Sequence, residues 1–267
     1  MCYTKPMKKT FWTLVATLIL IGLLYIYKTK TVTYTPVTQT PIPITETPKD
    51  PISEIMKDMS VEEKIGQLLI LGFHGTTTNT HITQLIQKYH VGGVNLLRYN
   101  ITDTDQTKKL TSDLQKLYGE NHDLPFIIAV DQEGGTVVRF PFLKEKTAEP
   151  KVRTVEQAQE IAKNRARELK DLGVNMNFAP VVDFITSTKS YLYDRTFATT
   201  TVGTIELAKI MAETYLEHGV MPVYKHFPGY GNSTINPHTS VTLFDGTRDM
   251  FNQNIEVFRS VLSNETR

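Results

Sequence analysis

The chain has 267 residues, of which 40% are apolar and 21% are charged, an ordinary balance for a globular protein. Its formal net charge of +1 provides no strong field that would attract nucleic acid or an acidic substrate. The single cysteine, Cys2, excludes an intrachain disulfide and any metal site built from several thiolates. The seven histidines show no close spacing of the HExxH kind, so no metal site is indicated.

An uncharged, mostly apolar segment, Phe11–Tyr27, lies near the N-terminus. Its length is at the short end of the roughly 17–25 residues of a membrane-spanning helix and exceeds the roughly 7–15 of a signal-peptide core. No small-x-small cleavage site follows it, so we predict that residues 1–30 form a retained signal anchor rather than a cleaved signal peptide. Lysines are slightly more numerous before the segment than after it, which favours a cytoplasmic N-terminus. The sequence thus predicts a single-pass protein of the cell membrane, with its remaining residues on the extracytoplasmic side.

Residues 31–50 are rich in threonine and proline and poor in large apolar side chains. Such a segment cannot bury enough surface to fold, and its prolines keep it extended. We therefore predict a linker over residues 31–50 and a folded domain over residues 51–267.

Apolar, strand-like runs alternate with helical patterns along this domain. Ser60 followed by Glu63 has the form of a capping box and predicts a short helix before the first strand. That strand is expected to be buried on both faces because its apolar run is continuous. We predict strands over Gln67–Phe73, Val91–Leu97, Pro125–Gln132, Val174–Asp183 and Met221–Phe227. We predict helices over His81–His90, Asp103–Tyr118, Val155–Leu172, Thr204–His218 and Arg248–Leu262.

Strands that alternate with helices indicate an α/β domain with a parallel sheet and right-handed crossovers. An open doubly wound sheet and a barrel both fit this pattern. No GxGxxG or P-loop motif follows any strand, which argues against a nucleotide-binding sheet. A full (β/α)8 barrel has eight units in about 250 residues. The domain holds about five, so we expect an incomplete fold of the (β/α)8 TIM-barrel type.

Polar residues follow the third, fourth and fifth predicted strands where the apolar runs end. They are Asp131, Gln132, Glu133, Asn177, Asp183, Lys225 and His226. Any one of them could simply cap a loop or carry a surface charge. Ligands bind at this edge of parallel α/β sheets and barrels, so polar groups on several strand ends together indicate a binding site.

The segment KHFPGYGNSTINPH, from Lys225 to His238, is the most specific feature of the chain. Its glycines, asparagines and prolines predict a long, shaped loop that returns His238 toward the strand end that carries Lys225 and His226. Adjacent side chains on a strand point to opposite faces, so the strand must be distorted if Lys225 and His226 contact one ligand.

Four motifs resemble glycoside hydrolase family 3. They are VDQEGGTVVRF from Val130, NMNFAPVVDF from Asn175, DRTF from Asp194 and KHFPGYG from Lys225. Their order and spacing are similar to those of the N-terminal barrel of this family, from about Val61 to the end of the chain. The branch they resemble is that of the bacterial β-N-acetylglucosaminidases, or β-N-acetylhexosaminidases, that act on peptidoglycan fragments.

The resemblance implies five residues that bind a non-reducing terminal sugar. They are Asp131, Arg139, Arg195, Lys225 and His226. A neutral sugar needs several convergent donors and acceptors rather than one strong charge, and this set provides them. The alternative for Arg195 is a structural ion pair with a nearby carboxylate such as Asp194.

The resemblance also implies an acid/base residue, a histidine paired with an aspartate two residues before it. His238 matches the histidine, but Asn236 stands where the aspartate is expected. Neutral asparagine can orient an imidazole but cannot raise its pKa as a carboxylate does. The alternative for His238 is an ordinary exposed loop histidine. The family's nucleophile is an aspartate after the seventh strand, and no residue of this chain matches it.

Two functions follow from these patterns. The first is hydrolysis of a terminal β-linked N-acetylhexosamine in carbohydrate or cell-wall metabolism, with retention of configuration in the complete form and with no metal or organic cofactor. The second is membrane-tethered, non-catalytic binding of cell-wall sugar. Asn236 and the missing strands favour the second, whereas the predicted sugar-binding set fits both.

Overall fold

The structure is a computed structural model that describes residues 50–120 and 124–263. The chain divides into two units, residues 1–54 and 55–267, and almost all of the first lies outside the described residues. The predicted signal anchor and the predicted linker up to residue 49 fall there too. Within the described ranges, every helix is too short or too polar to cross a membrane.

Five parallel strands form one sheet in the order β1-β2-β3-β4-β5. They are β1 (Ile70–Leu71), β2 (Gly93–Leu96), β3 (Ile127–Val130), β4 (Met176–Asn177) and β5 (Met221–Pro222). A doubly wound sheet reverses its strand order partway, whereas a barrel adds each strand beside the one before it. The strictly sequential order therefore confirms the parallel α/β prediction and selects the TIM-barrel type over the doubly wound sheet.

Helices precede and separate the strands. They are α2 (Pro51–Lys57), α3 (Val61–Gln67), α4 (Thr80–Gln87), α5 (Thr104–Gly119), α6 (Val155–Asp171), α7 (Thr201–Glu217) and α8 (Arg248–Leu262), with 3₁₀ turns η1 (Arg98–Asn100) and η2 (Glu149–Lys151). The predicted capping box is present, because Glu63 N–H donates to Ser60 Oγ at 3.1 Å and Ser60 N–H donates to Glu63 Oε2 at 2.7 Å. A polar side chain likewise caps the first turn of α4, α5, α6, α7 and α8.

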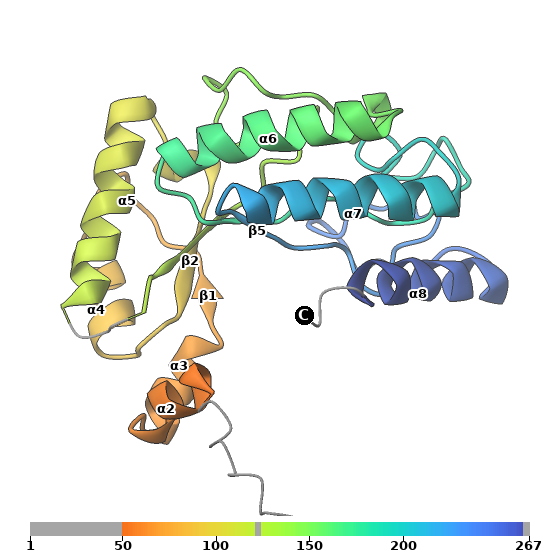
Figure 1. Cartoon of the computed structure of the whole chain (residues 1–267). Coiled ribbons are helices and arrows are strands. Elements are labelled where there is room, and N and C mark those ends of the chain that lie inside the picture. The colour runs from red at the N-terminus through yellow and green to blue at the C-terminus, as the bar shows by residue number, and fades with distance from the viewer. Residues whose placement is uncertain (1–49, 121–123, 264–267) are drawn as a thin grey trace, which may run out of the picture. The chain divides into compact units, whose positions relative to one another are not determined.

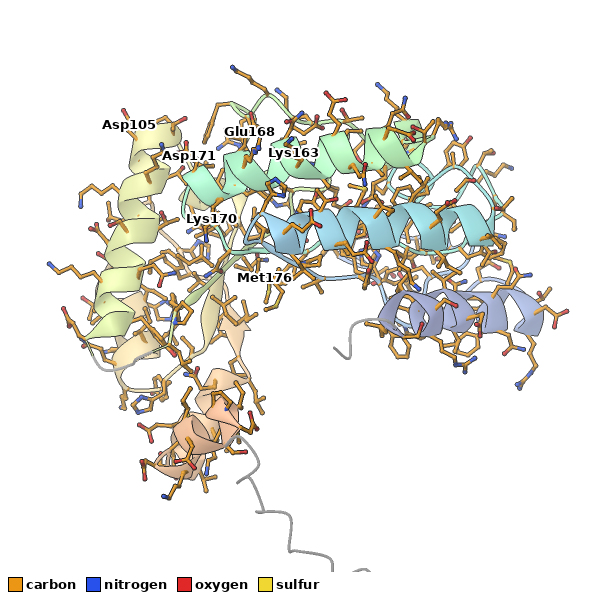
Figure 2. The ribbon with its side chains drawn as sticks, in the orientation of Figure 1. Asp105, Lys163, Glu168, Lys170, Asp171 and Met176 are labelled. Carbon is orange, nitrogen blue, oxygen red and sulfur yellow. The ribbon has the colours of Figure 1, made fainter. Side chains whose placement is uncertain are left out.

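Helices α6 and α7 lie side by side, and α8 packs along α7 (Figure 1). Their apolar faces join the central strands in one core that includes Ile128, Leu169, Tyr215 and Phe258. Charged residues on α6, such as Lys163, Lys170 and Asp171, are exposed, whereas Met176 of β4 is buried (Figure 2).

The observed strands are shorter than predicted, and the first prediction was wrong in detail. Gln67 is the last residue of α3, and Leu68 is 82% exposed rather than buried. Both residues of β1 are only partly buried, so the predicted full burial of this strand was wrong. Strand β1 pairs only with β2 within the described residues and is therefore an edge strand. The fourth and fifth predictions ran beyond Asn177 and Pro222, where β4 and β5 end, and among the described residues only an isolated bridge between Val181 and Lys225 follows.

Candidate functional site

A pocket of about 680 Å³ lies where strands β2 to β5 end. Six of the seven residues predicted for the site line it, and the seventh, Asn236, does not. The six are Asp131, Arg139, Arg195, Lys225, His226 and His238. Residues that are up to 107 positions apart thus share one concave surface, because the carboxyl ends of parallel strands meet at one edge.

Asp131, the first residue after β3, binds two cations. Its Oδ1 accepts from Lys225 Nζ at 2.8 Å, and its Oδ2 lies 3.9 Å from the guanidinium of Arg139. Asn95, at the end of β2, donates to the same Oδ2 at 3.4 Å. Burial alone would raise the pKa of Asp131, but the charge and hydrogen bond of Lys225 outweigh it and hold the pKa below its usual value. Asp131 is therefore ionised at neutral pH.

Glu133 is the central anion of the site, a role the sequence did not assign. Its carboxylate accepts from Arg195 Nε at 2.9 Å and from Arg195 Nη2 at 2.8 Å, and it lies 2.5 Å from Lys225 Nζ. Its side chain is 2% exposed. Burial would raise the pKa of Glu133, yet the hydrogen bonds from Arg195 and the charge of Lys225 lower it overall. Arg195 is thus ion-paired as the alternative expected, but with Glu133 and not with Asp194.

Asp183 holds His226 from the other side. Its Oδ2 accepts from both the backbone N–H and the ring Nδ1 of His226, each at 2.8 Å, and its Oδ1 accepts from the N–H of Tyr230 at 3.1 Å. The other ring nitrogen of His226, Nε2, lies 3.1 Å from Arg195 Nη2. Asp183 is fully buried, so it acts on the pocket only through His226 and the loop.

Lys225 and His226 both line the pocket, as a shared ligand would require. The peptide bond between them is cis. These contacts form one unbroken chain of polar groups, in which three carboxylates are joined by an imidazole, a guanidinium and an ammonium group. Its members, in order, are Asp183, His226, Arg195, Glu133, Lys225 and Asp131.

A second layer of buried groups fixes the loop that carries Glu133. Arg165 of α6 is fully buried and donates to the backbone oxygens of Glu133, at 2.8 Å, and Thr147, at 2.7 Å. Gly134 has a φ of 90°, and a Cβ there would lie 2.1 Å from Thr147 O, so only glycine fits this turn. Glu149 is also fully buried, accepts from Val181 N–H at 3.0 Å, and has its pKa raised well above the usual value, mainly by burial.

The loop residues Asn236 and His238 are held much less firmly. Asn236 Oδ1 accepts from the backbone N–H of His238 at 3.0 Å, which is a local turn of the Asx type. The ring of His238 has no hydrogen-bond partner among the described residues, and the residue is exposed. Asn236 therefore neither contacts nor orients the imidazole, although His238 reaches the pocket.

The pocket offers ammonium and guanidinium donors beside carboxylate acceptors, at fixed separations. Such a surface suits a neutral ligand that carries several hydroxyl groups, because each hydroxyl can both donate and accept. Within residues 50–120 and 124–263, no three histidine, cysteine or acidic side chains are grouped so as to hold a metal ion.

Comparison with known proteins agrees with this geometry. The chain is 28% identical over 234 residues to beta-hexosaminidase LpqI of Mycobacterium tuberculosis, an alignment that covers 85% of this chain and 58% of the relative. It is 31% identical over 191 residues to beta-hexosaminidase A of Pseudoalteromonas piscicida, covering 67% of this chain and 31% of the relative. The chain thus spans about half the length, or less, of these two relatives.

Solved structures share the fold. A family 3 β-N-acetylglucosaminidase from Paenibacillus sp. FPU-7 superposes with a TM-score of 0.70 at 28% identity, covering 77% of this chain and 40% of that one. LpqI of M. tuberculosis superposes with a TM-score of 0.68 at 26% identity, covering 80% of this chain and 62% of that one. The family model described as the glycosyl hydrolase family 3 N terminal domain matches residues 60–267. The chain therefore belongs to glycosyl hydrolase family 3.

Proposed function

We propose that the pocket binds a terminal β-linked N-acetylhexosamine, and that the complete enzyme hydrolyses its glycosidic bond with retention of configuration. The observation that carries the proposal is the chain of contacts from Asp183 to Asp131. It fixes four of the five predicted sugar-binding side chains relative to one another, and Arg139 lies at its end. The names of the relatives, beta-hexosaminidase and β-N-acetylglucosaminidase, support the choice of sugar.

His238 is the proposed acid/base, because it lines the pocket from a loop and its ring is not engaged elsewhere. A retaining glycosidase also needs a nucleophilic carboxylate about 5 Å from the acid/base. The two described carboxylates of the pocket, Asp131 and Glu133, are both bound by cations, so we assign the nucleophile to neither. We propose that it comes from outside the described residues.

We further propose that residues 1–30 anchor the protein in the cell membrane, with the domain on the extracytoplasmic side. The apolar segment Phe11–Tyr27 and its flanking lysines support this placement. Peptidoglycan fragments would then be within reach of the pocket, and no nucleic acid is expected as a partner.

Binding of free N-acetylglucosamine to the full chain tests the proposal. NMR titration of the ¹⁵N-labelled protein should show saturable shifts for residues around the pocket. Glucose, which lacks the acetamido group, should bind more weakly and controls for non-specific sugar contact. Absence of saturable shifts with N-acetylglucosamine, in a protein whose spectrum shows it to be folded, would reject the proposed substrate class.

A second candidate is a membrane-tethered, non-catalytic sugar-binding protein. The hydrogen bond that Asn236 accepts from the backbone N–H of His238 favours it, because that side chain then does not orient the ring of the proposed acid/base. Both candidates predict sugar binding, and turnover of a β-N-acetylhexosaminide distinguishes them.

A further inference from the structure

Each ring nitrogen of His226 has one hydrogen-bond partner. One partner acts as an acceptor, and the other can only donate. Asp183 accepts at Nδ1 at 2.8 Å, and both of its oxygens already accept backbone N–H groups, so it acts as an acceptor. Arg195 Nη2 lies 3.1 Å from Nε2, and a guanidinium can only donate. The proton of a neutral His226 must therefore be on Nδ1, and Nε2 must carry the lone pair.

We propose that Asp183 is a positioning residue which keeps the ring proton of a neutral His226 on Nδ1, so that the lone pair of Nε2 accepts from Arg195 and holds that guanidinium at the pocket. The proposal deepens the sugar-binding function and rests on it for the identity of the ligand. Nε2 has a single lone pair, so a sugar hydroxyl that donates to it must first displace Arg195 Nη2, whereas the oxygen of a hydroxyl can accept directly from Lys225 or Arg195.

This assignment separates the two histidines of the pocket by role. Nε2 of His226 faces the pocket without a proton, so His226 cannot give a proton to a leaving group from that atom. His238 lines the same pocket with an unengaged ring, so it is the described histidine there that is free to donate a proton to a leaving group. Asp183 thus assigns His226 to positioning Arg195 and leaves His238 for proton donation.

The tautomer can be measured directly in the full-length protein without any sugar. Long-range ¹H–¹⁵N correlation spectra at about pH 8, well above the ordinary histidine pKa of about 6.5, show which ring nitrogen lacks a proton. His218 provides an internal reference, because its Nδ1 lies 2.9 Å from the carbonyl oxygen of Thr214, which can only accept. The signals of His226 are identified by their loss in His226→Gln.

We expect His226 to show an unprotonated Nε2 and a protonated Nδ1, as His218 does. The opposite tautomer in the parent protein would overturn the proposal. Asp183→Ala removes the acceptor and should shift His226 toward the Nε2–H form. A folded Asp183→Ala protein that keeps the Nδ1–H form would show that Asp183 does not position the ring.

Asp183→Asn keeps the assay informative if the alanine variant does not fold. An asparagine retains one acceptor oxygen, so it should preserve the Nδ1–H form while it loses the bond from Tyr230. Inversion of the tautomer in Asp183→Asn would contradict this account. Asp194→Ala is the matched control, since Asp194 is exposed, next to Arg195 in the chain, and its side chain makes no hydrogen bond or ion pair within the described residues.

Sugar affinity forms a separate arm of the experiment. Asp183→Ala should bind N-acetylglucosamine about tenfold or more weakly than the parent, and Asp194→Ala should bind like the parent. If the parent binds no sugar but shows the expected tautomer, the proposed function fails and the positioning role of Asp183 stands. If the parent binds sugar but shows the Nε2–H form, the positioning role fails alone.

Discussion

Two groups of residues line or adjoin the pocket, and they differ in how firmly their side chains are fixed. One group lies at the strand ends, from Asp131 to His226, and the other is the loop pair Asn236 and His238. Glu133 is 2% exposed and binds two cations, and Asp183 is fully buried and accepts three N–H groups. The loop, in contrast, is exposed, and its only polar contact within the proposed dyad is a local turn.

Preorganised groups lose little freedom when a ligand binds, whereas a free loop side chain must be ordered at that moment. The strand-end set is therefore suited to recognising a ligand as it stands. The loop is not suited to proton transfer as it stands, because proton transfer needs an imidazole at a defined position. Binding and catalysis are therefore separable in this pocket.

The largest expected effect concerns hydrolysis. We expect the 267-residue chain to show no turnover of a chromogenic β-N-acetylglucosaminide above the uncatalysed rate. Both described carboxylates of the pocket are bound by cations, and loss of a nucleophile typically lowers the rate by several orders of magnitude. The measurement is release of the chromophore, with a complete family member as the positive control. Turnover close to that of the control would show that one of these carboxylates, or another residue of the chain, acts as the nucleophile.

Glu133→Gln should have the next largest effect. It keeps the shape of the side chain but leaves Arg195 and Lys225 without their shared anion, and breaking a buried ion pair costs about 3–5 kcal/mol. We expect the free energy of unfolding in urea to fall by about this amount and sugar binding to become undetectable. Glu256→Gln is the matched control, because Glu256 is exposed and its pair with Arg259 is worth about 0–1 kcal/mol.

Lowering the pH should reproduce part of the stability loss expected for Glu133→Gln. The pKa of Glu133 is lowered in the folded protein, so its contribution to stability is present above the unfolded value of about 4.3 and disappears as the pH falls through the folded value. The parent should therefore lose stability on acidification more steeply than Glu133→Gln does. Equal acid dependence of the two proteins would mean that Glu133 is not the anion that holds the site together.

The sequence was sufficient to predict the alternating elements and the residues that share the pocket. Periodicity and apolar runs give element type, and strand ends in a parallel sheet meet at one edge, so Asp131 and Lys225 could be placed together. It did not give the strand lengths, because strand pairing depends on the neighbouring strands: β1 pairs only with β2 within the described residues, and β4 and β5 pair over two residues.

The sequence also could not predict which side chains contact one another inside the pocket. Glu133 and Asp183 were recognised as polar strand-end residues, but which cation or ring each one contacts depends on side-chain directions that no spacing rule fixes. Asn236 was expected at the imidazole, whereas a backbone N–H two residues away competes successfully for its oxygen. The functional roles of the predicted residues remain predictions.

A moderate gain is expected from Asn236→Asp, measured in a chimaera that carries the C-terminal part of a hydrolytic relative. A carboxylate that reaches the ring of His238 would orient it and stabilise the imidazolium that protonates the leaving group. General acid–base catalysis contributes about 10²–10⁴-fold, so a gain of about tenfold is within range. The gain should be larger for an unactivated disaccharide than for an activated phenol, and it should vanish in the presence of His238→Ala.

The rate of the Asn236→Asp variant also tests the local turn in which residue 236 accepts from the backbone N–H of His238. If the aspartate continues to accept from the backbone N–H of His238, the ring stays free and the rate will not change. Equal rates for Asn236→Asp and its parent on the disaccharide would thus show that the turn, and not the missing charge, limits the loop.

The smallest effect is expected at Glu149, beneath the pocket. Its carboxyl is fully buried and its pKa is raised well above the usual value, first by burial and then by the charge of Glu133. A group with a raised pKa contributes stability below its unfolded pKa of about 4.3, and this contribution is lost as the pH rises through the folded value. Glu149→Gln cannot ionise and keeps one oxygen for the N–H of Val181. We expect the variant to be slightly less stable than the parent near pH 4, by about 1 kcal/mol or less, and to match or exceed the parent's stability at pH 8.

Urea unfolding across this pH range measures the difference. The control is Glu160→Gln, an exposed substitution on α6, which should show no such trend. A stability difference between Glu149→Gln and the parent that does not vary with pH would mean that Glu149 does not change its charge between the two states, and that the strand-end network tolerates a second buried anion below it.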